Sequence, residues 1–431
     1  MTRNVKNRAR VWLLAGVAAA SVALSPVVTT VAQAQMKKDP IKIGFGMALT
    51  GGLAGAGKGA LISMQVWAED TNKAGGLLGR PVELVFYDDQ TNPATVPGIY
   101  TKLLDVDKVD LIVSGYGTNL IAPVLPIAIQ RGKILMALFG LGNNEEYKYD
   151  RYFQILPAGP VPRRGISEGY FELAKKMGMK TVALISADAE YAQNSAEGGR
   201  QNAAAAGLKI VYDKSYPPTN ADFSPIIRAI NATNPDVVFV SSYPPDSVGM
   251  VRALNEIGPA PSIKMFGGGM VGLQFASIAN SLGDKLNGIV NYDYYVAEKT
   301  VTTPEIEALL AKYQPLAKEQ GVDPLGHYLP PWSYAYLQIL GTAINATNSL
   351  DDKVLAEYIH KTEFNTVVGP VKFGPSGEWV KARALMVQYK GLKEGKAVDA
   401  YAIPGARQIL YPENLATGTW MTYEDGKKFG M

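Results

Sequence analysis

The sequence contains no cysteine and only two histidines among its 431 residues. The lack of cysteine excludes disulfides, thiolate nucleophiles, Cys-ligated zinc and iron–sulfur clusters. We also expect no lipid anchor, because that modification needs a cysteine. His327 and His360 do not form a metal-spaced pair, and no G-x-S-x-G nucleophile motif occurs. Asp88 and Asp89 are adjacent in an expected strand, so their side chains point to opposite faces and suit neither acid/base catalysis nor a metal clamp.

Long apolar runs are also missing after residue 34, where no stretch approaches the roughly 18–20 residues of a membrane span. The start of the chain differs. Four basic residues precede an apolar run at residues 11–24, and Ala32-Gln33-Ala34 follows. This order predicts an export signal, residues 1–34, that is cleaved after Ala34. A signal retained as a membrane anchor is the alternative.

A strong charge of either sign is lacking as well. The expected signal holds four basic and no acidic residues, so the remaining 397 residues carry 38 basic and 39 acidic side chains. No basic field is left to attract nucleic acid or a membrane surface. At roughly 100–200 residues per domain, this length predicts two or three domains.

What the sequence does contain is a repeated alternation of apolar, strand-length runs with amphipathic, helix-length runs. Such strands indicate a parallel sheet covered on both faces. Two similar blocks therefore predict an α/β fold with two Rossmann-like lobes. The expected strands are 41–47, 82–87, 111–114 and 134–137, then 181–186, 209–212, 237–241 and 264–266. The expected helices between them are 58–73, 93–105 and 120–130, then 162–176, 192–205, 223–232 and 247–256.

The last third of the chain is mixed. Residues 303–318, 332–345 and 352–361 read as helices, and residues 384–389 read as a strand. We interpret the tail from residue 393 as extended chain that wraps a lobe.

Ligands of open parallel sheets bind at the carboxyl ends of the strands, where helix N-termini offer free N–H groups. Loops 49–57, 115–119 and 140–144 occupy these places in the first block, and 187–191 and 241–246 in the second. Thr118 and Asn119 could bind a carboxylate, or could merely cap the next helix. Tyr191 and Tyr243 could close over an aromatic ligand, or could be ordinary loop residues.

The sequence of the first of these loops differs from a nucleotide-binding motif at one position. Residues 52–59 match G-x-x-x-x-G-K-[ST] except that Gly59 replaces the hydroxyl residue that would hold Mg²⁺. An exported protein would also meet no ATP, so we expect a different small anion there.

Together these segments resemble the periplasmic leucine/isoleucine/valine-binding protein family, type I solute-binding proteins of ABC importers. The resemblance rests on IKIGFGMALTGGLAGAGKGA from residue 41, TNKAGGLLGRPVELVFYDD from residue 71, PVLPIAIQRGKILM from residue 123 and FNTVVGPVKFGPSGEW from residue 364. It implies two lobes joined by a three-strand hinge, with crossings near 157–161, 291–296 and 377–383. Lobe 1 would comprise 35–159 and 294–378, and lobe 2 would comprise 160–293 and 379–431.

The resemblance also implies a periplasmic, monomeric protein without a cofactor, which captures a small carboxylate by hinge closure and delivers it to a permease of the inner membrane. In that family the second strand-end loop holds the ligand carboxylate through a hydroxyl residue, which corresponds to Thr118. Our candidate ligand-binding residues are Ala56, Thr118, Asn119, Leu141, Gly142, Asn143, Tyr191, Tyr243 and Gly269.

Departures from the family pattern bear on the ligand. Amino-acid binders of the family hold the ligand ammonium with a threonine, which corresponds to Gly142, and with an acid, which falls within residues 267–269, all glycine. A tryptophan frequent in the family falls near Ala56. We therefore favour a non-amino organic or aromatic acid over an α-amino acid, and expect room for a larger ligand at these small residues. A ligand-binding module of a sensory system and a periplasmic enzyme are the alternative functions.

Overall fold

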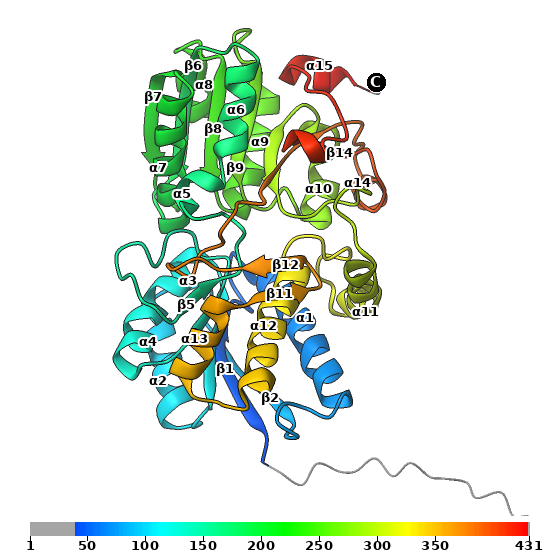
Figure 1. Cartoon of the computed structure of the whole chain (residues 1–431). Helices are drawn as coiled ribbons and strands as arrows, with labels where there is room; N and C mark the ends of the chain where they lie inside the picture. The colour runs from blue at the N-terminus through cyan, green and yellow to red at the C-terminus, as the bar shows by residue number, and fades with distance from the viewer. Residues whose placement is uncertain (1–38, 430–431) are drawn as a thin grey trace, which may run out of the picture. The chain divides into compact units, whose positions relative to one another are not determined.

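Two β-sheets organise residues 39–429, the part of the chain that this computed structural model describes (Figure 1). They lie within one unit, residues 37–431. The expected export signal falls outside the described residues. The α/β architecture with parallel-sheet lobes is confirmed.

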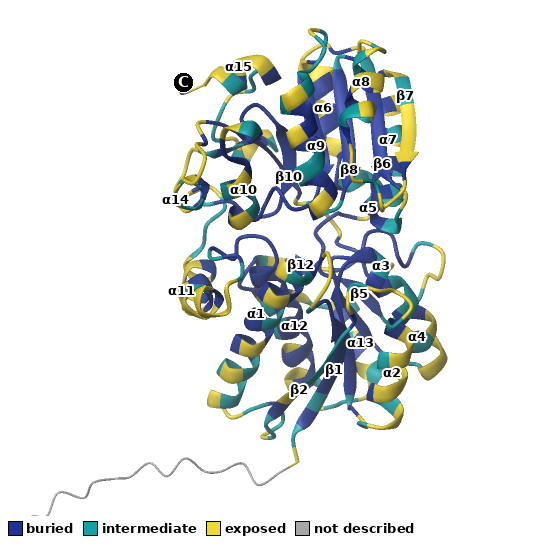
Figure 2. Ribbon diagram, turned by 180° about the vertical axis from the view of Figure 1, so that it is seen from behind, coloured by how far each residue is buried: buried dark blue, intermediate teal, exposed yellow. Residues whose placement is uncertain are grey.

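The first sheet has five strands in the order β2-β1-β3-β4-β5, all paired in parallel. Nearly every residue of its inner strands is buried, because helices cover both faces (Figure 2). The strands are β1 (Ile41–Met47), β2 (Val82–Asp88), β3 (Leu111–Tyr116), β4 (Leu135–Leu138) and β5 (Tyr152–Gln154). The helices on this side are α1 (Ala54–Lys73), α2 (Val96–Asp105), α3 (Thr118–Ile121), η1 (Ala122–Val124), α4 (Leu125–Arg131), α11 (Pro304–Gln320), α12 (Pro330–Thr347) and α13 (Asp352–Lys361).

The second sheet has seven strands in the order β14-β13-β10-β9-β8-β6-β7. Its last two strands pair antiparallel, so this sheet is mixed rather than purely parallel. The strands are β6 (Thr181–Ala187), β7 (Lys209–Tyr216), β8 (Val237–Ser242), β9 (Met265–Met270), β10 (Val290–Asp293), β13 (Leu385–Tyr389) and β14 (Arg407–Tyr411). The helices on this side are α5 (Pro162–Gly165), α6 (Glu168–Lys176), α7 (Glu190–Ala205), α8 (Ser224–Asn231), α9 (Pro244–Ile257), α10 (Ala276–Leu282), η2 (Gly283–Leu286), α14 (Ala397–Tyr401), η3 (Glu413–Leu415) and α15 (Tyr423–Lys428).

Several expectations about single elements were wrong. The helix expected at 162–176 is two helices, α5 and α6. The helix expected at 120–130 is divided into α3, η1 and α4, because Pro123 lacks an N–H group and its ring obstructs a continuous helix. The strand expected at 264–266 runs on to Met270, so the three glycines are strand residues. The tail is not simply extended. It forms β14, which pairs with β13 in the second sheet, and the helices α14 and α15, which lie on the same side of the molecule as that sheet.

The chain passes between the two sheets three times. The first passage lies between β5 and α5, the second between β10 and α11, and the third between the hairpin β11 (Glu363–Thr366)–β12 (Gly369–Lys372) and β13. These passages overlap the three expected crossings. The lobe boundaries that we derived from the crossings stay a prediction.

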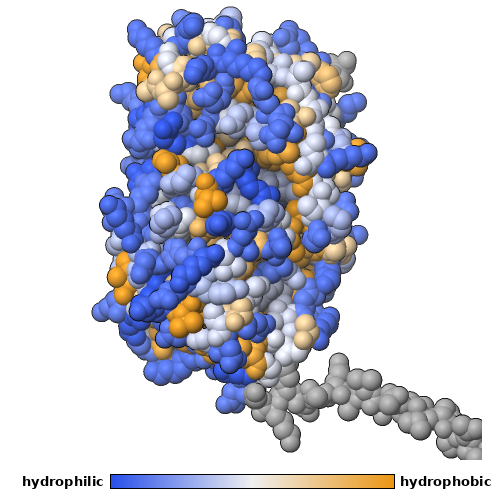
Figure 3. All heavy atoms as spheres, viewed as in Figure 1, coloured by the Kyte–Doolittle hydropathy of each residue, from blue (hydrophilic) through white to orange (hydrophobic). Residues whose placement is uncertain are grey.

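Surface composition gives no sign of an extended apolar face on the side shown in Figure 3, where hydrophobic atoms are scattered among hydrophilic ones. Exposed large apolar side chains among the described residues are isolated, such as Val106, Val161 and Ile403. Scattered residues of this kind are normal on a globular surface.

Candidate ligand-binding site

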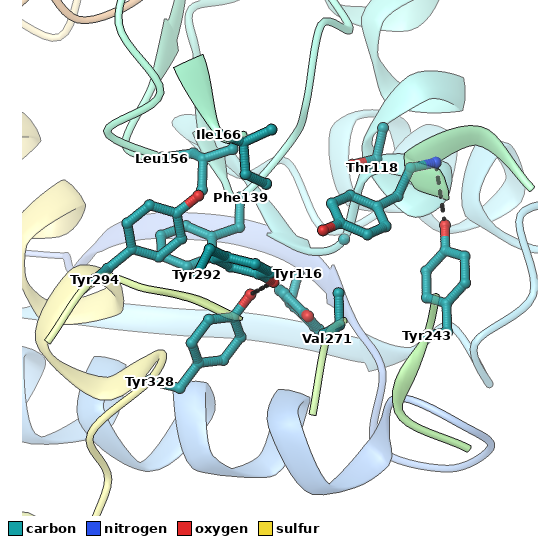
Figure 4. Close-up of a pocket in the computed structure, with 12 residues that line it drawn as sticks. Tyr116, Thr118, Phe139, Leu156, Ile166, Tyr243, Val271, Tyr292, Tyr294 and Tyr328 are labelled. Carbon is teal, nitrogen blue, oxygen red and sulfur yellow. Dashed lines mark hydrogen bonds between the residues drawn. The ribbon is translucent and has the colours of Figure 1, made fainter. Parts of the chain in front are cut away.

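A cavity lies where the carboxyl ends of strands from both sheets meet. Its walls come from β3, from the loop after β4, from the start of α7, from the connection between β8 and α9, and from the second passage between the sheets (Figure 4). The lining residues are Tyr116, Gly117, Thr118, Phe139, Leu156, Ile166, Tyr191, Tyr243, Val271, Tyr292, Tyr294 and Tyr328. About 20 Å³ inside it is open to the centre of a water-sized sphere, which is roughly what one ordered water needs. A larger ligand therefore requires the rings or the lobes to move apart.

Thr118 is held at the cavity wall by the turn that ends β3. Gly115 precedes it where a Cβ atom would lie 2.0 Å from the carbonyl oxygen of Gly46, so only glycine allows β3 to approach β1 this closely. Thr118 is 1% exposed, and its hydroxyl oxygen accepts a hydrogen bond from the Leu141 amide at 3.0 Å. The hydroxyl proton is left to be donated to an acceptor in the cavity. The reading of Thr118 or Asn119 as a helix cap is wrong, because Gly117 is the N-cap and no side chain caps α3.

Six tyrosines give the cavity its aromatic character. The hydroxyls of Tyr292 and Tyr328 are 3.0 Å apart, and the Tyr191 hydroxyl donates to the Gly269 carbonyl at 3.2 Å. The Tyr243 hydroxyl accepts from the Tyr191 amide at 3.2 Å (Figure 4). The Tyr294 hydroxyl is buried and has no hydrogen-bond partner among the described residues.

The rings pack edge to face rather than loosely. The Phe139 ring lies 5.2 Å from Tyr294 and 5.4 Å from Tyr328 between centroids, and Tyr191 lies 5.7 Å from Tyr243. Such geometry is favoured because the electron-poor edge of one ring meets the electron-rich face of another.

Among the described residues, no lysine, arginine, histidine, aspartate or glutamate lines the cavity. Burial raises the pKa of Tyr116, Tyr191 and Tyr243 above its ordinary value, and raises the pKa of Tyr292, Tyr294 and Tyr328 still further. All six hydroxyls are therefore neutral near pH 7, and those that do not already donate to a neighbour can donate to a ligand. The cavity offers hydrogen bonds and aromatic surface but no fixed charge.

A family model described as a periplasmic binding protein matches residues 40–396. The chain belongs to the periplasmic binding protein family. A Leu/Ile/Val-binding protein homolog 8 from Brucella abortus is 26% identical over 415 residues, covering 93% of this chain and 96% of its own. An amino acid binding protein from Pseudomonas aeruginosa is 25% identical and covers 76% of this chain and 86% of its own.

Solved structures of periplasmic binding proteins share the fold. One from Burkholderia mallei has a TM-score of 0.73 at 17% identity, covering 88% of this chain and 97% of its own. A solute-binding protein from R. palustris, in complex with 4-hydroxybenzoate, has a TM-score of 0.72 at 20% identity. The match covers 83% of this chain and 95% of the R. palustris chain. A leucine-binding protein from Thermotoga maritima has a TM-score of 0.70 at 18% identity, covering 82% and 99%. Within residues 39–429 of this periplasmic binding protein, no helix has both the length and the apolar character to cross a membrane.

The candidate residues of this periplasmic binding protein fall into two groups. Thr118, Tyr191 and Tyr243 line the cavity; Ala56, Asn119, Leu141, Gly142, Asn143 and Gly269 do not. Whether any of them touches a ligand stays a prediction.

Several residues of the second group connect the two lobes instead. The Asn143 side-chain amide donates to the Thr118 carbonyl at 3.0 Å and to the Glu190 carboxylate at 3.1 Å. The Leu141 carbonyl accepts from the Asn194 side chain at 2.7 Å. These bonds join the loop after β4 to α7, and so hold the cavity closed from one side.

The space expected at Gly142 and Gly269 is not there. A Cβ atom on Gly142, whose φ is +73°, would lie 2.9 Å from Arg163 Nε, and one on Gly269 would lie 2.9 Å from the Val240 carbonyl oxygen. Ala56 does face open space, an apolar cavity of about 280 Å³ whose other walls include Pro244 and Phe275.

Most of the aromatic lining was missed by sequence reasoning. Tyr116, Phe139, Tyr292, Tyr294 and Tyr328 were not among the candidates. Tyr116 lies in the expected ligand-binding loop 115–119, and Tyr292 and Tyr294 lie in the expected crossing 291–296. These three tyrosines could have been proposed because they lie within those segments.

The residues considered for nucleotide binding or catalysis do not line the cavity. Lys58 is exposed on α1, away from the cavity lining. His360 is half-buried: its ring lies 4.7 Å from the Phe153 ring, and Nε2 is 2.7 Å from the Asp150 carbonyl oxygen. No group of three metal-ligating side chains occurs in the described part of the chain.

Proposed function

We propose that this periplasmic binding protein captures a small aromatic carboxylic acid and delivers it to an ABC importer. The observation that carries the proposal is the uncharged, tyrosine-rich lining of the cavity. We further propose that the export signal of residues 1–34 brings the protein to the periplasm, where it meets a permease of the inner membrane.

An α-amino acid is disfavoured by the chemistry of this lining. Its ammonium group would be buried without a carboxylate, and the cost of an unpaired buried charge is several kcal/mol. The lining contains no acidic side chain, and Gly142 and Gly269 offer only backbone groups in the places that the family resemblance assigns to the ammonium partners.

The cavity lining suits a carboxylate better, because its neutral hydroxyls can donate hydrogen bonds to the carboxylate oxygens. Thr118 and Tyr243 each accept one hydrogen bond from a backbone amide and retain their own proton, and the Tyr294 hydroxyl is unpartnered among the described residues. Hydrogen bonds to a charged group contribute about 1.5–3 kcal/mol each. The surrounding rings then supply edge-to-face and stacking contacts for an aromatic ligand.

The comparisons support an aromatic acid without deciding it. Three structural neighbours were solved with 4-hydroxybenzoate, benzoate and 3,4-dihydroxybenzoic acid. Other relatives are described as leucine or amino acid binding, so an amino acid is the second candidate ligand.

Ligand entry requires the lobes to separate, since the cavity in its present form is too small. We propose that rotation about the three passages opens the cavity, and that closure forms the bonds of Asn143 and Asn194 between the lobes. Tyr191 and Tyr243 then cover the ligand.

Isothermal titration calorimetry tests the proposal. Protein lacking residues 1–34 is unfolded and refolded to remove any co-purified solute, then titrated with 4-hydroxybenzoate, benzoate, phenylalanine and leucine. We expect the two benzoates to bind and the two amino acids to bind at least tenfold more weakly. Tighter binding of leucine or phenylalanine would overturn the choice of an organic acid.

A sensory role would use the same cavity and the same closure. The neighbouring genes distinguish the two: genes for a permease and an ATPase beside this one support import, and a gene for a receptor kinase supports sensing.

A further inference from the structure

Three ionisable side chains form a continuous buried group behind the cavity. The Arg407 guanidinium lies 2.9 Å from an Asp293 carboxylate oxygen and 2.6 Å from His327 Nδ1. Asp293 is 0% exposed, Arg407 3% and His327 4%. The guanidinium also stacks over the Tyr401 ring, 4.2 Å from its centroid. Because all of its neighbours are buried, Arg407 is held in one place by charge, hydrogen bonding and packing together.

This buried group is directly connected to the cavity wall. Asp293 stands between Tyr292 and Tyr294 in the sequence, and His327 precedes Tyr328; all three tyrosines line the cavity. The Asp293 carboxylate accepts hydrogen bonds from the backbone amides of Tyr294 at 2.8 Å and Tyr295 at 3.3 Å.

Arg407 therefore ties together two backbone segments that carry neighbouring parts of the wall. One segment is the end of β10 with the second passage, and the other is the loop before α12. The hydroxyls of Tyr292 and Tyr328, one from each segment, meet at 3.0 Å in the cavity (Figure 4). A shift of either segment would change this contact and the distance between the rings.

The residue that makes the connection comes from an unexpected part of the chain. Arg407 begins β14, which lies after the region that the family model matches, residues 40–396. We propose that the C-terminal tail sets the ligand cavity, with Arg407 as a positioning residue that fixes the spacing of Tyr292, Tyr294 and Tyr328 and thereby the affinity for the ligand. The statement about affinity rests on the proposed function.

His327 acts in this group as a neutral acceptor. Burial and the neighbouring guanidinium lower the pKa of His327 well below its usual range, so Nδ1 is free to accept the Arg407 N–H group. Lysine cannot reproduce both contacts, since it lacks the planar fork of the guanidinium, but it retains the positive charge beside Asp293.

The test compares Arg407→Lys with Arg131→Lys. Arg131 pairs with Asp105 at 2.6 Å on the surface of the first lobe and serves as a matched control outside the cavity. Three measurements are made on each variant: far-ultraviolet circular dichroism for the fold, tyrosine absorbance across an alkaline pH titration, and calorimetry with 4-hydroxybenzoate.

We expect Arg407→Lys to keep the fold, to let cavity tyrosines ionise at lower pH than in the wild type, and to raise the Kd for 4-hydroxybenzoate at least tenfold. Arg131→Lys should match the wild type in all three. A folded Arg407→Lys protein with wild-type tyrosine titration and wild-type Kd would overturn the proposal.

Two other experimental outcomes also test the proposal. If Arg407→Lys does not fold, His327→Phe removes the acceptor while keeping an aromatic ring at that position, and the same changes are expected; unchanged values overturn the proposal. If the wild type does not bind 4-hydroxybenzoate, the proposed ligand is wrong, and the tyrosine titration alone then decides whether Arg407 positions the wall.

Discussion

At the scale of single residues, two hydroxyls of the cavity, those of Thr118 and Tyr243, each accept a hydrogen bond from a backbone amide and keep a proton to donate. Thr118 is the clearest case, because the Leu141 amide occupies one lone pair of its hydroxyl oxygen. The hydroxyl is thereby oriented before any ligand arrives, which lowers the ordering cost of binding.

Thr118→Val should weaken 4-hydroxybenzoate binding by about 1–3 kcal/mol, because a hydrogen bond to a charged group is lost at constant side-chain volume. Thr118→Ser keeps the hydroxyl and should lose much less. Calorimetry on the three proteins, with melting curves to confirm folding, measures the difference. Equal affinity of the valine variant and the wild type would remove Thr118 from the site.

A second residue-scale effect concerns stability rather than binding. Asp88 and Asp89 follow one another but sit in different environments. Burial opposes ionisation of Asp88, yet hydrogen bonds from the Thr50 hydroxyl and from nearby backbone amides outweigh it and lower the pKa of Asp88. Asp89 is 1% exposed, and its burial raises its pKa to about 6.

Asp89 therefore favours the folded state only while it is protonated. The unfolded chain releases this proton near its ordinary pKa of 3.8 and the folded chain near 6, so the contribution is lost as pH rises through that window. Asp89→Asn should gain stability relative to the wild type between pH 4 and about 6, with a constant difference above. Urea unfolding at several pH values measures this, and a difference that does not vary with pH would contradict the raised pKa.

Sequence alone could predict Thr118, Tyr191 and Tyr243 because each follows a strand end, where loops face the cavity. It could not predict Phe139, Leu156 or Tyr328, since their positions depend on how the lobes face each other. It also misjudged Gly142, whose neighbour Arg163 belongs to the other lobe.

At the scale of elements, close approach between backbones decides where helices and strands can lie. A Cβ atom on Gly57 in α1 would be 2.0 Å from the Ala48 carbonyl oxygen. The glycines that nearly completed a nucleotide-binding motif thus include one that lets α1 pack against the end of β1. Periodicity predicted most of the longer helices and strands, but not the strands β5, β10, β11, β12 and β14. The break of the helix at Pro123 and the extension of β9 through its glycines depend on packing.

Gly57→Ala should destabilise the protein although alanine favours a helix by about 1 kcal/mol over glycine, because α1 must move away from β1. Gly98→Ala in α2 is the matched control, since a Cβ atom there meets nothing within 4 Å; it should stabilise by roughly 0.5–1 kcal/mol. The denaturant concentrations at the unfolding midpoints of the two variants, compared with that of the wild type, show which change destabilises the protein and which stabilises it. A Gly57→Ala protein as stable as the wild type would refute the packing argument.

At the scale of the whole molecule, we expect contacts between the lobes to contribute to binding alongside the wall residues. Asn194 donates to the Leu141 carbonyl across the lobes, while its neighbour Gln193 donates within its own lobe, to Asp188 and Ala187. The two side chains are adjacent in α7 and differ mainly in which lobe they reach.

Asn194→Ala should therefore raise the Kd for the ligand by about tenfold or less, the equivalent of 0.5–1.5 kcal/mol, and should reduce the ligand-induced decrease in radius of gyration seen by small-angle scattering. Gln193→Ala should change neither quantity. If both variants behave alike, the bond to Leu141 does not contribute to closure.

Trp332 adds a practical consequence of the aromatic wall. Its ring lies 6.0 Å from Tyr294 and 6.0 Å from Phe139, at the start of α12, without lining the cavity itself. Excitation energy absorbed by the neighbouring tyrosine reaches this indole efficiently at such a separation, and any solute that displaces Tyr294 changes that transfer. We therefore expect the emission of this indole to report occupancy of the cavity, so that capture and release can be followed without an attached dye.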